Sequence, residues 1–139
     1  MSQRSSSPKR RVGSALIAVD ERGENSIVVT PGANASVTSE DLHPDLFVGA
    51  KVVLLQLEIP LPTVRRAAQL GHAARACVIL NAAPAQTLSS ADLAHEDVLV
   101  ANEDEAGILS GCAVDEVGAF EVAALLSELG PAVVLTFEV

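Results

Sequence analysis

Four short, largely apolar runs constrain the fold of this chain more than any other feature. They cover residues 51–57, 77–80, 97–101 and 133–137. Continuous apolar runs of this length are typical of strands that are buried on both faces. Because helix-like stretches separate them, the pattern indicates an α/β fold with a parallel sheet and right-handed crossovers.

The stretches between these runs read as helices. An Ala-rich segment after Pro60 and Pro62 favours a helix, and a glycine at the end of a helical pattern marks a C-terminus. The expected helices cover residues 63–76, 89–95 (a short helix), 103–110 (closed by Gly111) and 115–129 (closed by Gly130).

A different pattern precedes the sheet. Ser14–Asp20 and Asn25–Thr30 are short apolar runs joined by Glu21–Glu24, a Gly-containing connector of hairpin length. Pro31–Asn34 then ends the second strand, and Thr38–Asp41 has the capping residue and acids of a helix start. We expect this hairpin to stand apart from the parallel sheet.

The chain contains more hydrophobic residues than a single small domain can bury. With 139 residues, the chain has the length of one domain, yet 49% of its residues are hydrophobic and its mean hydropathy is +0.36. This excludes intrinsic disorder, and the apolar runs are well short of the ~20 residues of a membrane span. We therefore expect the chain to oligomerise or to be part of something larger.

The net charge of −9 is unevenly distributed. Four of the nine basic residues lie in the first eleven positions, and all 18 acids follow. An acidic body argues against nucleic-acid binding. Residues 1–12 could be a transit peptide or a nuclear signal, but they have no apolar face, so a disordered basic tail is the favoured interpretation.

Several other site types are excluded or disfavoured. The sequence contains no G-x-x-x-x-G-K-[ST], G-x-G-x-x-G or G-x-S-x-G motif. Cys77 and Cys112 cannot form a disulfide framework, which favours a reducing cytoplasm, and Cys77 is expected to be buried within its strand. The scattered histidines are expected at the surface rather than in a metal site, and they are His43, His72 and His95.

Polar residues follow the apolar runs at the points where the strands end. Glu58, Asn81, Asn102 and Thr136 therefore reach one edge of the sheet, where ligands bind in open α/β folds. Together they suggest a polyol or phosphate site. Asn81 and Asn102, each taken alone, are better explained as structural caps, whereas a carboxylate at Glu58 needs a partner or water.

The helix start at Asn102 adds an anion-binding feature. Asn102 and Glu105 are three positions apart and share a helix face, and a helix N-terminus favours anions. A carboxylate beside a phosphate requires a divalent cation between them, and Mg²⁺ takes few carboxylates and several waters.

These residues fall within recognisable strings. They are ALIAVD…GENSI and GANA within residues 15–35, LQLEIP at 55–60, NAAPA at 81–85, and NEDEA with a downstream LSG at 102–111. In this order, over roughly residues 14–136, they resemble the ribokinase (PfkB carbohydrate kinase) family. Ala82 replaces the proline that is usual in the third string.

The resemblance implies ATP-dependent phosphorylation of D-ribose to ribose 5-phosphate, with Mg²⁺ and an activating K⁺. By position, Glu58 would hydrogen-bond the sugar and Asn102 would contact the ATP phosphates. Glu105 would organise the Mg²⁺ and phosphate region, and Thr136 would begin the nucleotide loop. The hairpin, residues 13–36, would belong to the lid that also forms a homodimer contact, and residues 37–139 would be a fragment of the α/β core.

The family's di-glycine motif, its T-L-G-x-x-G loop and its G-A-G-D segment do not occur in these 139 residues. The last of these supplies the anion hole and the catalytic base in the family, so the chain alone is expected to be inactive. Two hypotheses remain open: a central piece of a ribokinase, or a degenerate partial paralogue that acts as a non-catalytic sugar-binding or dimerising module.

Overall fold

A computed structural model describes residues 14–19, 25–30 and 32–137. The predicted tail over 1–12 and the connector over 21–24 lie outside the described residues. The strands are β1 (Ser14–Val19), β2 (Asn25–Thr30), β3 (Val52–Gln56), β4 (Cys77–Asn81), β5 (Val98–Asn102) and β6 (Ala132–Thr136). The helices are α1 (Leu61–Ala73), α2 (Glu103–Ser110), α3 (Val114–Val117) and α4 (Ala119–Ser127), and the 3₁₀ turns are η1 (Asn34–Ser36), η2 (Ser39–Asp41) and η3 (Pro44–Phe47).

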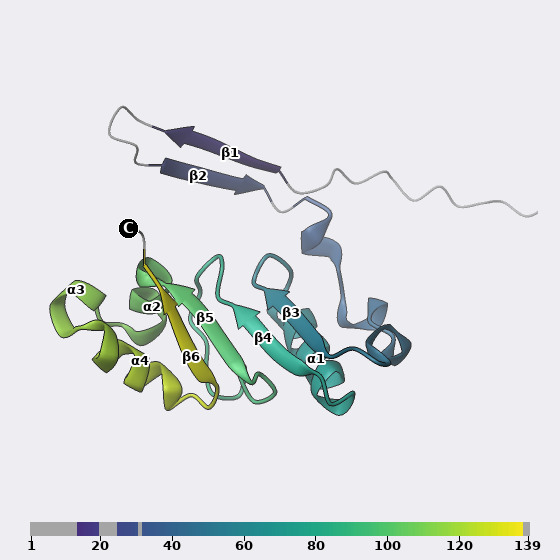
Figure 1. Ribbon diagram of the computed structural model, residues 1–139. Coiled ribbons are helices and arrows are strands. Elements are labelled where there is room, and N and C mark those ends of the chain that lie inside the picture. Colours follow the sequence, from purple (N-terminus) through teal and green to yellow (C-terminus); the bar gives the residue numbers. More distant parts are fainter. Residues whose placement is uncertain (1–13, 20–24, 31, 138–139) are drawn as a thin grey trace, which may run out of the picture.

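The four expected sheet strands form one parallel sheet in the order β3-β4-β5-β6. The strands β1 and β2 form a separate antiparallel hairpin with Ser14 opposite Thr30 and Val19 opposite Asn25. Figure 1 shows this hairpin beyond the carboxyl ends of the parallel strands. The predicted α/β fold class, with its leading hairpin, is confirmed.

All the packed helices cover the same face of the sheet. Helix α1 packs on β3 and β4, while α2 and α4 pack on β5 and β6. Leu80 and Leu99 point into this layer and are about 1% exposed or less, and they share one core cluster with Val64 of α1 and Val122 of α4. Because each connection in the order β3-β4-β5-β6 steps in the same direction, right-handed crossovers place every helix on one side.

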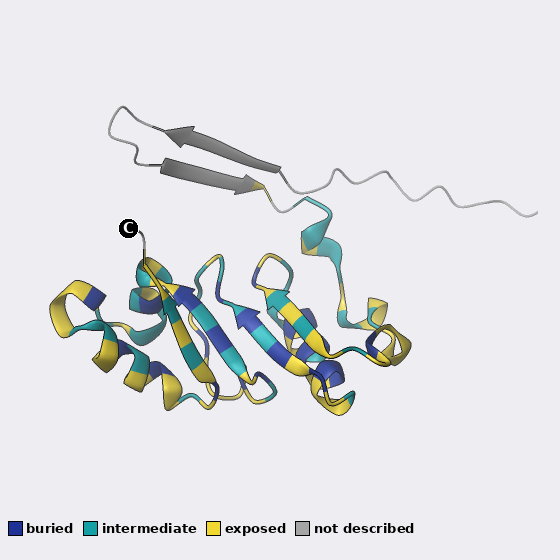
Figure 2. Cartoon of the chain, in the orientation of Figure 1, coloured by how far each residue is buried: buried dark blue, intermediate teal, exposed yellow. Residues whose placement is uncertain are grey.

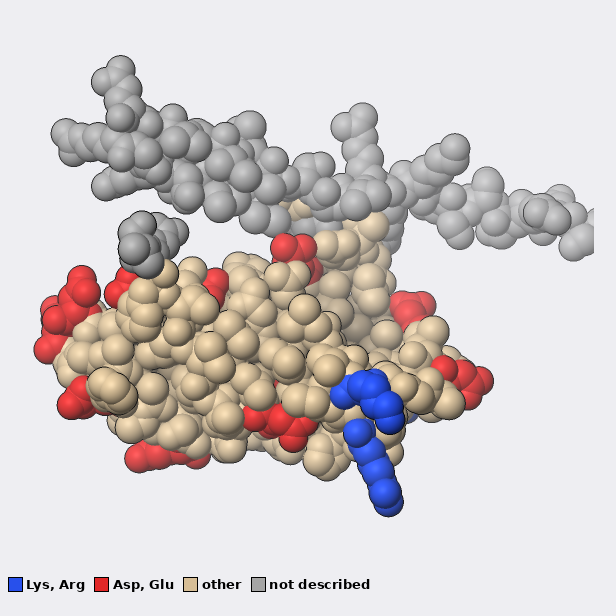
Figure 3. Space-filling view, in the orientation of Figure 1, with Lys and Arg blue, Asp and Glu red and all other residues tan. Residues whose placement is uncertain are grey.

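The opposite face of the sheet is open, which corrects the prediction of strands buried on both faces. Val52 is 56% exposed, Leu54 is 68% exposed and Val134 is 46% exposed. Cys77 lies in register with Val52 and is exposed as well, so its predicted burial is wrong. Figure 2 shows buried positions alternating with less buried ones along the strands of the sheet. In Figure 3 this face is a broad surface with acidic side chains mainly around its margin. The open face comprises Val52, Leu54, Gln56, Cys77, Ile79, Asn81, Val98, Val100, Asn102, Ala132, Val134 and Thr136.

Three expected helices differ in the structure. Residues 89–95 form turns, because Asp92 accepts hydrogen bonds from Ser89 and closes the segment on itself. The expected helix over 115–129 is divided into α3 and α4 at Gly118, whose φ of 95° is outside the helical region. The helix expected to start at Thr38–Asp41 has the capping box of a helix N-terminus but forms only the short 3₁₀ turn η2.

None of the described helices is both long enough and apolar enough to cross a membrane.

Candidate functional site

The carboxyl edge of the sheet collects the polar residues expected there. Gln56 is in register with Asn81, and Asn102 is in register with Thr136 on the neighbouring strand pair. All four fall on the outward side of the alternation along their strands, so they extend the open face into a polar margin. Gln56 was not expected there, although its place in the strand alternation would have identified it.

Glu58 lies two residues beyond β3 and is exposed. Its Oε2 accepts a hydrogen bond from Nδ2 of Asn34, at 3.3 Å, across 24 residues of sequence. Asn34 begins η1, directly after the hairpin. The structure thus gives Glu58 a side-chain partner, although its exposed carboxylate is also open to water, and adds Asn34 to the candidate site.

Asn34 was missed because nothing in its own segment indicates a ligand. It stands in the GANA string, and Glu58 stands in LQLEIP. The two strings were recognised separately, and only the packing of the segment after β2 against the end of β3 brings them together.

Asn102 and Glu105 form a reciprocal capping box at the start of α2. Asn102 Oδ1 accepts from the Glu105 backbone N–H at 2.8 Å, and Glu105 Oε2 accepts from the Asn102 N–H at 2.9 Å. The structural interpretation of Asn102 as a cap is therefore correct. Asn102 Nδ2 and Glu105 Oε1 make no hydrogen bond to the described residues and remain available to a ligand.

The first turn of α2 carries Glu103, Asp104 and Glu105. Three carboxylates here oppose the attraction that a helix N-terminus offers to an anion. Within the described residues, no three His, Cys, Asp or Glu side chains are grouped as a metal site. A single free carboxylate oxygen fits Mg²⁺ only where waters and phosphate oxygens complete the coordination shell.

The histidines are not all isolated. The rings of His72 and His95 lie 5.4 Å apart, although 23 positions separate them in the sequence. His43 lies elsewhere, where its Nδ1 accepts a hydrogen bond from the Asp45 N–H. A ring pair without further ligands does not amount to a metal site.

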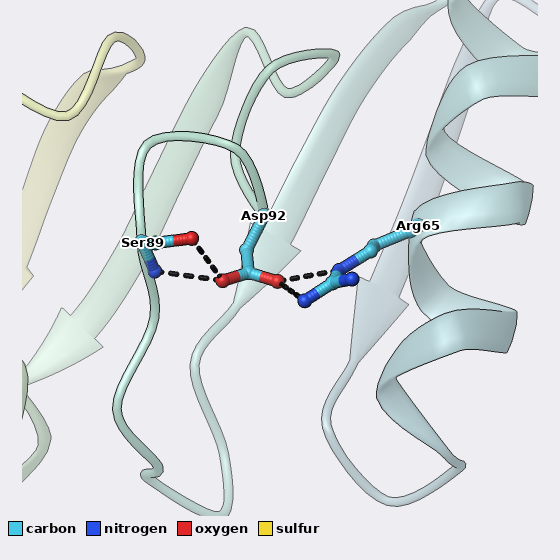
Figure 4. Close-up of polar contacts among 3 residues, drawn as sticks. All are labelled: Arg65, Ser89 and Asp92. Carbon is cyan, nitrogen blue, oxygen red and sulfur yellow. Dashed lines mark hydrogen bonds and ion pairs between the residues drawn. The ribbon is translucent and has the colours of Figure 1, made fainter.

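A second polar cluster lies between α1 and residues 89–96, on the helix side of the sheet (Figure 4). Arg65 pairs with buried Asp92 through Nη2 and through a 2.5 Å hydrogen bond from Nε. The other oxygen of Asp92 accepts from the Ser89 N–H at 2.8 Å and from its hydroxyl at 2.5 Å. Burial acts to raise the pKa of Asp92, but the Ser89 hydrogen bonds and Arg65 outweigh it and lower the pKa.

Glu96 is a buried carboxyl beside this cluster. Its Oε2 accepts from the His95 N–H at 3.1 Å, while its Oε1 has no hydrogen-bond partner among the described residues. Burial raises the pKa of Glu96, and the charges of Asp92 and Asp97 act in the same direction. A neutral Glu96 carboxyl relieves the cost of that buried oxygen.

Comparison with known proteins agrees with the motifs and the fold. Residues 3–136 match the family described as pfkB family carbohydrate kinase. A ribokinase of Staphylococcus aureus (strain COL) is 39% identical over 106 residues, which is 75% of this chain and 35% of that protein.

Two solved structures show the same fold. A ribokinase from Thermotoga maritima has a TM-score of 0.71 at 31% identity and covers 92% of this chain and 43% of its own. An Arabidopsis thaliana ribokinase, solved with ribose and ATP, has a TM-score of 0.72 at 24% identity over 93% and 43%. This chain spans less than half the length of these relatives. Its motifs, its fold and the extent of the family match place it in the pfkB family of carbohydrate kinases.

Proposed function

We propose that this chain supplies the sugar-contacting and nucleotide-contacting edge of a ribokinase-type enzyme, which transfers a phosphoryl group from ATP to D-ribose and gives ribose 5-phosphate. The observation that carries the proposal is the contact between Asn34 and Glu58 at the carboxyl edge of the sheet. It joins two strings of the family resemblance at the edge where α/β folds bind ligands.

The two side chains suit a polyol. Glu58 is acceptor-only when ionised, and its Oε1 is free of the hydrogen bond to Asn34. Asn34 offers both an amide donor and a carbonyl acceptor. A pair of this kind can bind two neighbouring sugar hydroxyls and fix the orientation of the ring, which is the positioning that phosphoryl transfer needs.

The nucleotide would lie toward the β5–β6 side of the same edge. Asn102 Nδ2 is a free donor for a phosphate oxygen, and the Thr136 hydroxyl is exposed on the adjacent strand end. Glu105 would hold the cation region through water. When bound, Mg²⁺ would neutralise phosphate charge, which the acidic first turn of α2 would otherwise repel. The proposed kinase function also includes K⁺ as an activating monovalent cation.

The open face supports a role within a larger enzyme. Parallel sheets occur almost only with both faces covered, and this one leaves Leu54 and Val134 exposed. Right-handed crossovers that continued beyond β6 would add helices to the face that is already covered. Strands added beyond β3 whose connections step away from β3, opposite to the β3-to-β6 direction, would place their helices on the open face. A ribokinase-type polypeptide has the additional length for such a layer.

A polypeptide of these 139 residues alone would lack turnover, because it contains no G-A-G-D segment for the anion hole and base. The Asn34–Glu58 contact nevertheless forms without that segment. It therefore also favours the second candidate, a non-catalytic sugar-binding module. Homodimerisation through the hairpin and a cytoplasmic location are further parts of the proposal, the latter supported by two free cysteines.

A chimera tests the proposal. Residues 14–136 of this chain would replace the matching segment of the Staphylococcus aureus ribokinase, and ribose phosphorylation would be followed by coupled ADP release. Glu58→Ala should lower kcat/KM for ribose by about 10- to 100-fold, the loss of a hydrogen bond to a charged group. Glu128→Ala, an exposed carboxylate after α4, is the matched control and should change little. Equal activity of the Glu58→Ala chimera and its parent would refute the assignment.

A further inference from the structure

A groove of about 410 Å³ lies on the outer side of α1, where that helix meets η2 and the 89–96 segment. It is lined by Ser39, Pro62, Arg65, Arg66, Gln69, Ala91 and His95. None of Glu58, Asn102, Glu105 and Thr136 takes part in it. The groove is therefore separate from the carboxyl-edge site, and a ligand bound in it is independent of the proposed function.

The groove is lined by two arginines although the chain as a whole is acidic, and one of them, Arg65, is paired with Asp92 beside the groove. Asp and Glu outnumber Lys and Arg by 18 to nine, yet no carboxylate lines the groove. The described Lys and Arg residues are Lys51, Arg65, Arg66 and Arg75. Two of these four side chains thus converge on one groove.

The two guanidinium groups are held by neighbours and still have free donors. Arg65 is fixed through Nε and Nη2 by buried Asp92, whose second oxygen is occupied by Ser89, so its Nη1 is left without a partner among the described residues. Arg66 Nη1 donates to Gln69 Oε1 at 2.7 Å, which leaves its Nε and Nη2 free of described partners. Guanidinium groups held in this way lose less entropy when they bind a ligand.

We propose that this groove binds a small phosphate-class anion, either inorganic phosphate or the phosphate of a phosphomonoester. Arg65 and Arg66 are its ligands, and Asp92 and Gln69 are the residues that position them. The tetrahedral oxygens of phosphate accept several donors at once, which matches two adjacent guanidinium groups. A planar carboxylate uses fewer of these donors and binds more weakly.

Equilibrium dialysis of the 139-residue chain against radiolabelled inorganic phosphate tests the proposal, whatever the association state of the chain. The ionic strength is held constant with chloride, because screening would otherwise change with the titration. We expect one phosphate per chain with a millimolar Kd. Arg66→Gln leaves the Asp92 pair intact and should weaken binding about tenfold, the loss of a charge-assisted hydrogen bond.

Lys51→Gln is the matched control, because Lys51 is an exposed cation outside the groove. It should leave the Kd unchanged. Arg65→Lys should retain the charge but weaken binding, since lysine cannot reproduce the forked geometry. Competition with phenyl phosphate and with acetate separates the two sources of phosphate from a carboxylate ligand.

Three results would overturn the proposal: no saturable phosphate binding, equal weakening by Arg66→Gln and Lys51→Gln, or displacement by acetate as effective as by phosphate. Displacement by phenyl phosphate supports a phosphomonoester, and its failure supports inorganic phosphate. None of these results depends on sugar phosphorylation.

Discussion

Truncation of Leu54 tests whether the open face is uncovered in this chain. Leu54 is 68% exposed and points to the open face, while Leu80 on the neighbouring strand is 1% exposed and points to the helices. Complete burial of a leucine side chain stabilises by about 1.5–3 kcal/mol. Because Leu54 loses only about a third of its exposure, its burial contributes about 0.5–1 kcal/mol.

Leu54→Ala should therefore lower the free energy of unfolding of the 139-residue chain by at most about 1 kcal/mol. Leu80→Ala creates a cavity in the core and should cost about 2–5 kcal/mol. Urea denaturation gives both values, and the measurement is repeated over a range of protein concentrations. In the chimera, where further sequence can cover this face, the cost of Leu54→Ala should rise toward that of Leu80→Ala.

Two results would contradict this interpretation of the open face. In the isolated chain at low concentration, equal costs for Leu54→Ala and Leu80→Ala would mean that the face is already covered. An unchanged cost of Leu54→Ala in the chimera would mean that the rest of the kinase does not pack there. A cost that grows with protein concentration would identify a second copy as the cover.

The remaining predictions concern local interactions. Asn102→Ala removes the cap of α2 and should cost about 1 kcal/mol by urea denaturation, whereas Asn102→Asp should cost much less. A group whose pKa is raised by folding stabilises the folded chain while it is protonated. The free energy of unfolding should therefore fall as the pH rises from 4.5 through the raised pKa of Glu96. Glu96→Gln should abolish that fall, as measured by unfolding at a series of pH values. The lowered pKa of Asp92 predicts the opposite pH dependence. The free energy of unfolding should fall as the pH decreases below 3.8, and Asp92→Asn should remove this dependence.

Local signals predicted much of the fold correctly. Apolar runs predicted all four strands of the sheet, and a glycine correctly marked the end of α2, where Gly111 has a φ of 74°. The errors arose where a second local feature opposed a helical sequence pattern. Gly118 divides a segment whose apolar pattern continues, and side-chain bonds from Ser89 to Asp92 replace a helix with turns.

The burial of the sheet could not be predicted from the runs alone. An apolar strand sequence is the same whether its second face is covered by its own chain or by other sequence, so Leu54 and Leu80 look alike in the sequence. The same limit applies to the candidate site, where part was predictable from the sequence and part depends on tertiary packing. Strand ends predicted Glu58, Asn102 and Thr136, but the amide of Asn34 comes from a segment 24 residues away and depends on tertiary packing.

Transfer of labelled phosphate from ATP to D-ribose is the decisive measurement for the proposed function, with the 139-residue chain and the chimera assayed side by side. We expect no turnover above background for the chain alone, turnover for the chimera, and a kcat/KM for ribose that is about 10- to 100-fold lower in the Glu58→Ala chimera. Turnover by the chain alone would contradict the requirement for further kinase sequence. An unchanged kcat/KM of the chimera after Glu58→Ala would contradict the sugar site.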